Sequence, residues 1–153
     1  MSKVLFLHGK EGTPTGSKPT KLRDVGFEVV APTLDKNDWR GSINEAELAM
    51  AMNMAGVIVG SSRGGAVAAS IPYLQIAKKI LIAPAWKAFG VDDPVVDRST
   101  VILHCKNDNI VPFEHSEELA ERYGCQLIEC GIDHRMNDPE TLNLIAKLVA
   151  AHA

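Results

Sequence analysis

The sequence predicts an α/β/α sandwich of three layers, built around a mainly parallel sheet of six strands. Short runs of almost entirely apolar residues alternate along the chain with longer amphipathic stretches, and this alternation is typical of β-α-β units. Runs that are apolar at nearly every position suit strands covered by helices on both faces. The length of 153 residues fits one domain, which we expect to span residues 1–153.

The expected strands share a length of four or five residues and a high apolar content. They cover residues 4–7, 27–31, 56–59, 79–82, 100–104 and 126–129. About five helices are expected between and after them, and four of these carry a start or stop signal. The first of the four begins at the capping box Ser42-Ile43-Asn44-Glu45, and the second covers residues 63–71 and ends before Pro72. The third covers residues 114–123 and ends before Gly124, and the fourth begins at Asp138-Pro139.

Composition excludes several classes of function. The formal net charge of −3 leaves the chain without the basic field that nucleic acid or an anionic membrane surface attracts. The three cysteines match no C-x-x-C metal or redox pattern, and we expect them to be reduced. No apolar run is long enough for a membrane span or a signal peptide. The sequence therefore favours a cytoplasmic protein with no nucleic-acid or membrane partner.

The strongest local motif is Gly60-Ser61-Ser62-Arg63-Gly64, which has the form G-x-S-x-G. An apolar strand precedes it and small residues follow it, as expected for a nucleophile on a sharp turn from strand to helix. The helix that begins there turns its partial positive charge toward developing negative charge. Ser62 is the candidate nucleophile, since Ser61 lacks glycines at the right offsets. The alternative is a glycine-rich helix start packed under the sheet.

With this motif and three further features, the chain resembles the α/β-hydrolase superfamily. His8-Gly9 follows the first strand, as in the family's oxyanion turn. Residues 105–112 follow the fifth strand and are similar to G-x-x-D-x-x-V-P, with Cys105 in place of the first glycine. Residues 131–134 follow the last strand and match G-x-x-H. The order Ser, Asp, His is the order that this fold uses.

The resemblance implies a role for each residue. Ser62 would attack the substrate carbonyl, His134 would take the serine proton, and Asp108 would orient the imidazole and stabilise its charged form. The backbone N–H groups of Arg63 and Lys10 would form the oxyanion hole. We expect the side chains of Arg63 and Lys10 to be solvated, although a preference for anionic substrates would also fit them.

Other residues have competing interpretations. The acidic residues Asp92, Asp93 and Asp97 follow the fourth strand, where some hydrolases keep their acid, but a solvated loop is the simpler interpretation. Trp86 and Phe89 follow the same strand and could line a substrate pocket or anchor the loop. No cluster of His, Cys and Asp has ligand spacing, so no metal is expected. Neither a P-loop nor a G-x-G-x-x-G motif is present, so no nucleotide cofactor is expected.

The expected activity is that of a carboxylesterase. Residues 83–99 are too few to form a cap domain between the fourth and fifth strands, so the implied fold is a minimal, lidless hydrolase with an open cleft. An open cleft encloses little of a long acyl chain, which favours small or short-chain esters. Thioesters and amides or peptides need the same machinery and remain alternatives. An inactive interaction module on the same fold and a homodimer also remain open.

Overall fold

The computed structural model describes residues 3–72 and 77–152. Within these ranges the elements in chain order are β1 (Lys3–Leu7), α1 (Ser17–Asp24), β2 (Glu28–Val30), α2 (Trp39–Asn53), β3 (Val57–Ser61), α3 (Arg63–Ala68), β4 (Lys78–Ile82), β5 (Val101–His104), α4 (Phe113–Tyr123), β6 (Gln126–Glu129) and α5 (Pro139–His152). The predicted strands all form, with ends that differ from the predicted ones by two residues at most.

The six described strands form one sheet in the order β2-β1-β3-β4-β5-β6, and every neighbouring pair is parallel. The α/β class is therefore confirmed, with a sheet that is fully rather than mainly parallel. The strand order reverses direction between β1 and β3. In open parallel sheets, sites form outside the carboxyl ends of the strands at such a reversal, and the loop after His8 and the turn at Ser62 both begin there.

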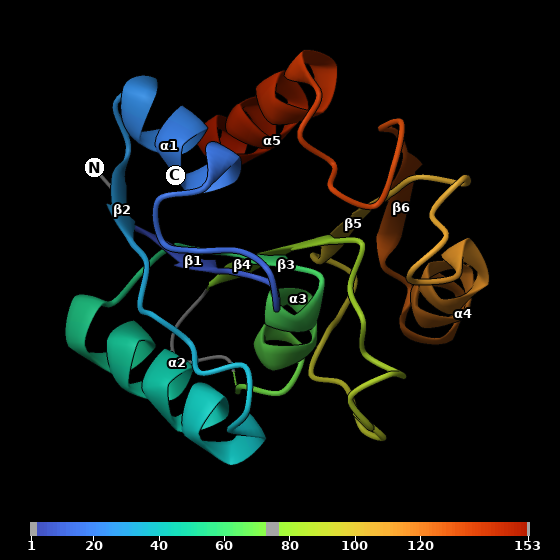
Figure 1. The fold of residues 1–153 in the computed structure, drawn as a ribbon, viewed down its shortest axis with the longest axis horizontal. Coiled ribbons are helices and arrows are strands. Elements are labelled where there is room, and N and C mark those ends of the chain that lie inside the picture. The colour runs from blue at the N-terminus through green and yellow to red at the C-terminus, as the bar shows by residue number, and fades with distance from the viewer. Residues whose placement is uncertain (1–2, 73–76, 153) are drawn as a thin grey trace.

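Helices cover both faces of the sheet, as Figure 1 shows, with α1 and α5 on one side and α2 and α3 on the other. Alternate strand residues point to opposite faces. Leu5 and Leu81 therefore join the buried core under α2 and α3, and Val4 and Ile80 join the core under α1 and α5. Among the described residues, no helix is both long enough and apolar enough to cross a membrane.

The helix boundaries differ from the predictions at α2. The helix begins at Trp39, capped by Asp38, whose carboxylate accepts a hydrogen bond from the N–H of Gly41 at 2.9 Å. Ser42 lies inside the helix and is buried, and its hydroxyl donates to the carbonyl of Asp35 at 3.0 Å. The predicted capping box at Ser42 is therefore wrong, because an acidic N-cap four residues earlier already starts the helix.

Two further differences have local causes. Helix α3 ends at Ala68 instead of residue 71. The N–H of Val95 donates a hydrogen bond to the carbonyl of Ala69 at 2.6 Å, and a further helical turn would need that carbonyl as an acceptor. Helix α1 was not among the four helices placed from sequence. Its eight residues are mostly polar, and the apolar residues that they bury are Pro19 and Leu22.

A buried lysine connects two of the chain crossings. Lys79 in β4 is fully buried, and its ammonium group donates to the carbonyls of Ile71 and Val95, each at 2.7 Å. Burial lowers the pKa of Lys79 to about 7, against the opposing effect of Asp97. The side chain therefore holds the segment after α3 against the loop before β5, at the expense of the charged form.

This lysine should make the stability of the protein depend on pH. An unfolded lysine has a pKa of about 10.4, so the unfolded chain binds more protons than the folded chain between pH of about 7 and about 10. The free energy of unfolding therefore rises with pH across that window. Urea unfolding of wild type and Lys79→Met should show a steeper rise for wild type. Lys78→Met, at the half-exposed neighbour, is the control and should run parallel to wild type; parallel curves for Lys79→Met would contradict the assignment.

Candidate active site

The turn that carries Ser62 is sharply bent. Ser62 links β3 to α3 with φ of 54° and ψ of −113°, a conformation that L-residues adopt only when the surroundings hold them there. The N–H of Ser62 donates to the carbonyl of Ile82 at 2.8 Å, and its carbonyl accepts from the N–H of Ala85 at 3.0 Å. Backbone hydrogen bonds from the β4 side thus fix the turn.

The glycines of the motif allow this turn because no side chain would fit beside it. A Cβ on Gly64 would overlap the carbonyl oxygen of Leu7, and a Cβ on Gly60 would overlap the carbonyl oxygen of Gly64. A Cβ on Gly9 would lie 3.3 Å from the Cβ of Ser62. The loop after β1 therefore lies directly against the turn at Ser62.

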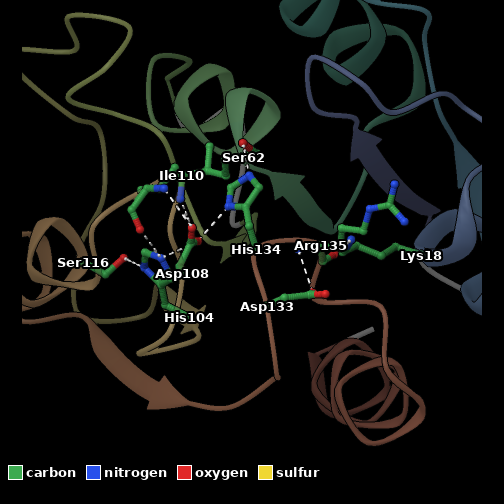
Figure 2. A network of polar contacts seen from close by, with 10 residues as sticks. Lys18, Ser62, His104, Asp108, Ile110, Ser116, Asp133, His134 and Arg135 are labelled. Carbon is green, nitrogen blue, oxygen red and sulfur yellow. Dashed lines mark hydrogen bonds and ion pairs between the residues drawn. The ribbon is translucent and has the colours of Figure 1, made fainter.

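Three distant side chains meet at this edge of the sheet (Figure 2). The Ser62 hydroxyl lies 2.9 Å from His134 Nε2, and His134 Nδ1 lies 2.7 Å from Asp108 Oδ2. The carboxylate of Asp108 is fully buried, whereas 20% of the His134 side chain is exposed. The three side chains therefore form a continuous series of hydrogen bonds from Ser62 through His134 to Asp108. The acidic residues after β4, Asp92, Asp93 and Asp97, are not part of this series.

The carboxylate of Asp108 is held in its charged form. Its Oδ1 atom accepts hydrogen bonds from the N–H groups of Ile110 and Val111, each at 2.8 Å. Burial alone would raise the pKa of Asp108, but the hydrogen bonds from His134, Val111 and Ile110 outweigh it and lower the pKa. Cys105, which replaces the family's glycine, is buried and closes the turn by accepting from the N–H of Asp108 at 3.2 Å. The acid loop therefore forms without that glycine.

The loop of His134 is anchored from the opposite end of the chain. Lys18 in α1 is buried, and its ammonium donates to the carbonyl of Arg135 at 2.5 Å, one residue after His134. Burial lowers the pKa of Lys18 to about 8, against the opposing effect of Asp133. Asp133 itself is exposed and accepts from the N–H of Arg135 at 3.1 Å. The sequence offered no signal for this contact, because helix α1 was not predicted.

The expected oxyanion loop lies beside the nucleophile. His8 Nε2 accepts from the N–H of Leu34 at 2.9 Å, so the proton of the neutral ring is on Nδ1, which lies 2.7 Å from the carbonyl of Gly9. The next residues form a turn, in which the N–H of Gly12 donates a hydrogen bond to the carbonyl of Gly9 at 3.1 Å. That hydrogen bond does not use the N–H of Lys10. The role of Lys10 and Arg63 as oxyanion donors stays a prediction.

The Arg63 side chain is not solvated, contrary to expectation. It is 2% exposed, and its guanidinium donates to the carbonyl of Asp35 and to the hydroxyl of Ser42, each at 3.0 Å. The group lies 5.4 Å from the ring centre of Trp39 and 5.6 Å from that of Phe89. Its charge is therefore directed at the start of α2 and is not offered to an anionic substrate.

The two aromatic residues expected near the site have anchoring contacts. Trp86 is buried, and its indole N–H donates to the carbonyl of His115 at 3.0 Å. Phe89 stacks on Trp39 with ring centres 5.2 Å apart. Trp86 directly follows Ala85, which bonds to Ser62. The prediction that Trp86 and Phe89 line a substrate pocket is not tested by these contacts.

One residue in the network was missed from sequence. His104, the last residue of β5, lies with Nε2 3.0 Å from Asp108 Oδ2 and with Nδ1 2.6 Å from the hydroxyl of Ser116. No role in the site was predicted for His104 from sequence. The usable signal was its position at a strand end, four residues before the expected acid.

No protein-family model matches the chain, and no curated protein matches its sequence. Solved structures do match. A protein from Xanthomonas campestris pv. campestris, assigned to the α/β hydrolase superfamily, matches with a TM-score of 0.84 at 19% identity, covering 98% of both chains. The ydeN gene product of B. subtilis matches with a TM-score of 0.76 at 15% identity, covering 99% of this chain and 98% of that one.

Est1E from Butyrivibrio proteoclasticus is a third match, with a TM-score of 0.72 at 17% identity, covering 98% of this chain and 86% of that one. At identities this low, the likeness concerns the fold. The chain has the α/β-hydrolase fold, as its motifs predicted, and the matches extend over almost its whole length.

The close packing at Gly64 gives a direct test of the turn. Gly64→Ala should destabilise the protein by about 2–3 kcal/mol or more, because the new methyl group meets backbone that cannot move without separating β1 from α3. Thermal unfolding followed by circular dichroism measures the effect. Gly16→Ala is the control, since its Cβ would meet only the carbonyl of Thr13 at 3.5 Å. Equal stability of the two variants would argue against this packing.

Proposed function

We propose that this protein is a serine hydrolase that cleaves small or short-chain carboxylic esters. The observation that carries the proposal is the continuous hydrogen-bonded chain from Ser62 through His134 to Asp108, with distances of 2.9 and 2.7 Å. Side chains within these distances can pass a proton while the nucleophile attacks. The fold supports the same activity, because matching structures include a protein assigned to the α/β hydrolase superfamily.

In the first half of the reaction, Ser62 attacks the ester carbonyl while His134 Nε2 accepts the hydroxyl proton. Asp108 keeps the other imidazole proton on Nδ1 and balances the positive charge that forms. His134 then protonates the departing alcohol as the tetrahedral intermediate collapses to an acyl-enzyme. In the second half, His134 deprotonates a water molecule, which attacks the acyl group and releases the carboxylic acid and free Ser62.

The negative charge on the tetrahedral oxygen requires donors beside Ser62. Arg63 is the first residue of α3, and the first N–H groups of a helix have no partner within the helix. Lys10 lies in the turn after Gly9, which packs against Ser62. We assign the two backbone N–H groups to the oxyanion hole, where the loss of one donor typically reduces turnover by about 10²–10³.

The preference for small substrates rests on the open route to the site. Residues 83–99, all of which are described, contain turns and bends but no helix or strand, so no cap is built from this segment. A site without a cap gives a long acyl chain little apolar enclosure. A second structure of Est1E, with ferulic acid bound, matches this chain with a TM-score of 0.73. A carboxylic acid is the kind of product that ester cleavage releases.

A fluorophosphonate probe tests the proposed nucleophile, since it reacts with an activated serine. Wild type and Ser61→Ala should be labelled, whereas Ser62→Ala should not be labelled. Asp108→Asn should label more slowly by a factor of about 10³–10⁴, because the amide would favour the wrong imidazole tautomer. Mass spectrometry of the labelled peptide locates the site. A wild-type protein that stays unlabelled would point instead to an interaction module without catalysis.

A series of nitrophenyl esters tests the proposed substrate class. The value of kcat/KM should be highest for acetate or butyrate and should fall for octanoate and laurate, because the longer chains gain little contact. Parallel assays with a thioester and an anilide of the best acid separate the three bond types. A preference for laurate would contradict the proposed open site. Faster cleavage of the thioester or the anilide would show that the enzyme acts on that bond type and not on esters.

A further inference from the structure

The hydrogen-bonded chain continues past Asp108. His104 Nε2 lies 3.0 Å from Oδ2 of Asp108, the same oxygen that His134 contacts at 2.7 Å. Figure 2 shows the carboxylate between the two imidazole rings, with Ser116 beyond His104. Both His104 and Ser116 are fully buried. This second histidine plays no part in the mechanism derived above.

The proton positions on His104 follow from its partners. Its Nε2 also lies 3.1 Å from the carbonyl oxygen of Val111, which can only accept a hydrogen bond. Nε2 therefore carries a proton and donates to the carbonyl and to Asp108. Burial lowers the pKa of His104, against the opposing effect of Asp108. The ring is therefore neutral near pH 7, Nδ1 is an acceptor, and the Ser116 hydroxyl donates to it at 2.6 Å.

This arrangement completes the hydrogen bonding of the carboxylate. Oδ1 of Asp108 accepts from the N–H groups of Ile110 and Val111, and Oδ2 accepts from His104 and His134. A donor on Oδ2 draws electron density away from the atom that stabilises the charged form of His134. It also holds that atom in place. The strength of the Asp108–His134 interaction therefore depends on a residue that touches neither substrate nor nucleophile.

We propose that His104 is a positioning residue for this reaction: it fixes Oδ2 of Asp108 and lowers its basicity, while Ser116 fixes the tautomer of His104. This inference rests on the proposed hydrolase function for its effect on turnover, but its effect on His134 does not require activity. The titratable groups that act on His104 electrostatically are Asp108 and His134.

The first test is an NMR titration of the His134 ring in wild type and in His104→Phe, which keeps a ring but removes the donor. Without the second donor, Oδ2 interacts more strongly with the charged form of His134. The titration midpoint should then move upward by about one pH unit, the order expected from one hydrogen bond to a charged group. His104→Gln retains a donor at a similar reach and should return the midpoint toward the wild-type value. His115→Gln, at an α4 histidine outside this network, is the control.

The second test uses kinetics on a nitrophenyl ester. His104→Phe should lower kcat/KM by about ten- to one-hundred-fold and move the acidic limb of its pH profile to higher pH. Ser116→Ala should act in the same direction but less, and should have no further effect in the double variant. Circular dichroism verifies that each variant is folded.

The outcomes separate this inference from the proposed function. A midpoint and a pH limb that stay unchanged in His104→Phe would overturn the positioning role, even if stability or turnover falls, since a purely structural residue would behave in that way. Additive effects of the His104 and Ser116 changes would also overturn it. An unlabelled wild-type Ser62 would overturn the hydrolase function alone, because the NMR titration would still decide the role of His104.

Discussion

The chain between β3 and α3 passes so close to the end of β1 that Gly64 has no room for a side chain beside the carbonyl of Leu7. This contact sets the position of the rest of the site. It brings the loop after β1 against Ser62, and it forces Ser62 into its bent conformation. The hydroxyl then projects from the carboxyl edge of the sheet, where the acid loop after β5 and the histidine loop after β6 also end.

Buried cations hold several loops of this fold in place. Arg63, Lys18 and Lys79 each donate to backbone carbonyls that lie outside regular helices and strands. An unpaired carbonyl in the interior is unfavourable, and so is a buried charge without partners. Each pairing gives both groups a partner, although Nε of Arg63 itself has none among the described residues. In a small domain, this arrangement fixes loops that have few apolar residues of their own.

The central carboxylate follows the same rule with the opposite sign. The side chain of Asp108 is fully buried, and within the described part of the chain its hydrogen-bond donors are backbone N–H groups and imidazole rings instead of a lysine or arginine. Neutral donors keep the carboxylate charged without cancelling its charge. The charge therefore remains able to stabilise a positive imidazole, which is the role that the proposed acyl transfer would require of it.

The sequence by itself determined the strands, the G-x-S-x-G turn and the order of Ser62, Asp108 and His134 along the chain. Those features depend on neighbours along the chain: apolar runs make buried strands, and Gly60 and Gly64 are needed where the backbone turns sharply. The start of α2 at Asp38 and the presence of α1 were also local matters, but their signals are weak. A short polar helix whose buried apolar residues are Pro19 and Leu22 does not differ in pattern from a loop.

Only the tertiary structure decided which groups surround the reactive residues. Lys18 reaches the loop of His134 across 117 positions of sequence, and Arg63 turns toward the start of α2 instead of toward solvent. His104 becomes part of the network because the turn after β5 folds Asp108 back onto it. The contacts of Lys18 and Arg63 arise from the packing of separate elements against one another, and no periodicity or motif in a single segment encodes them. The contact of His104 is local, but only the folded turn shows that the imidazole reaches Asp108.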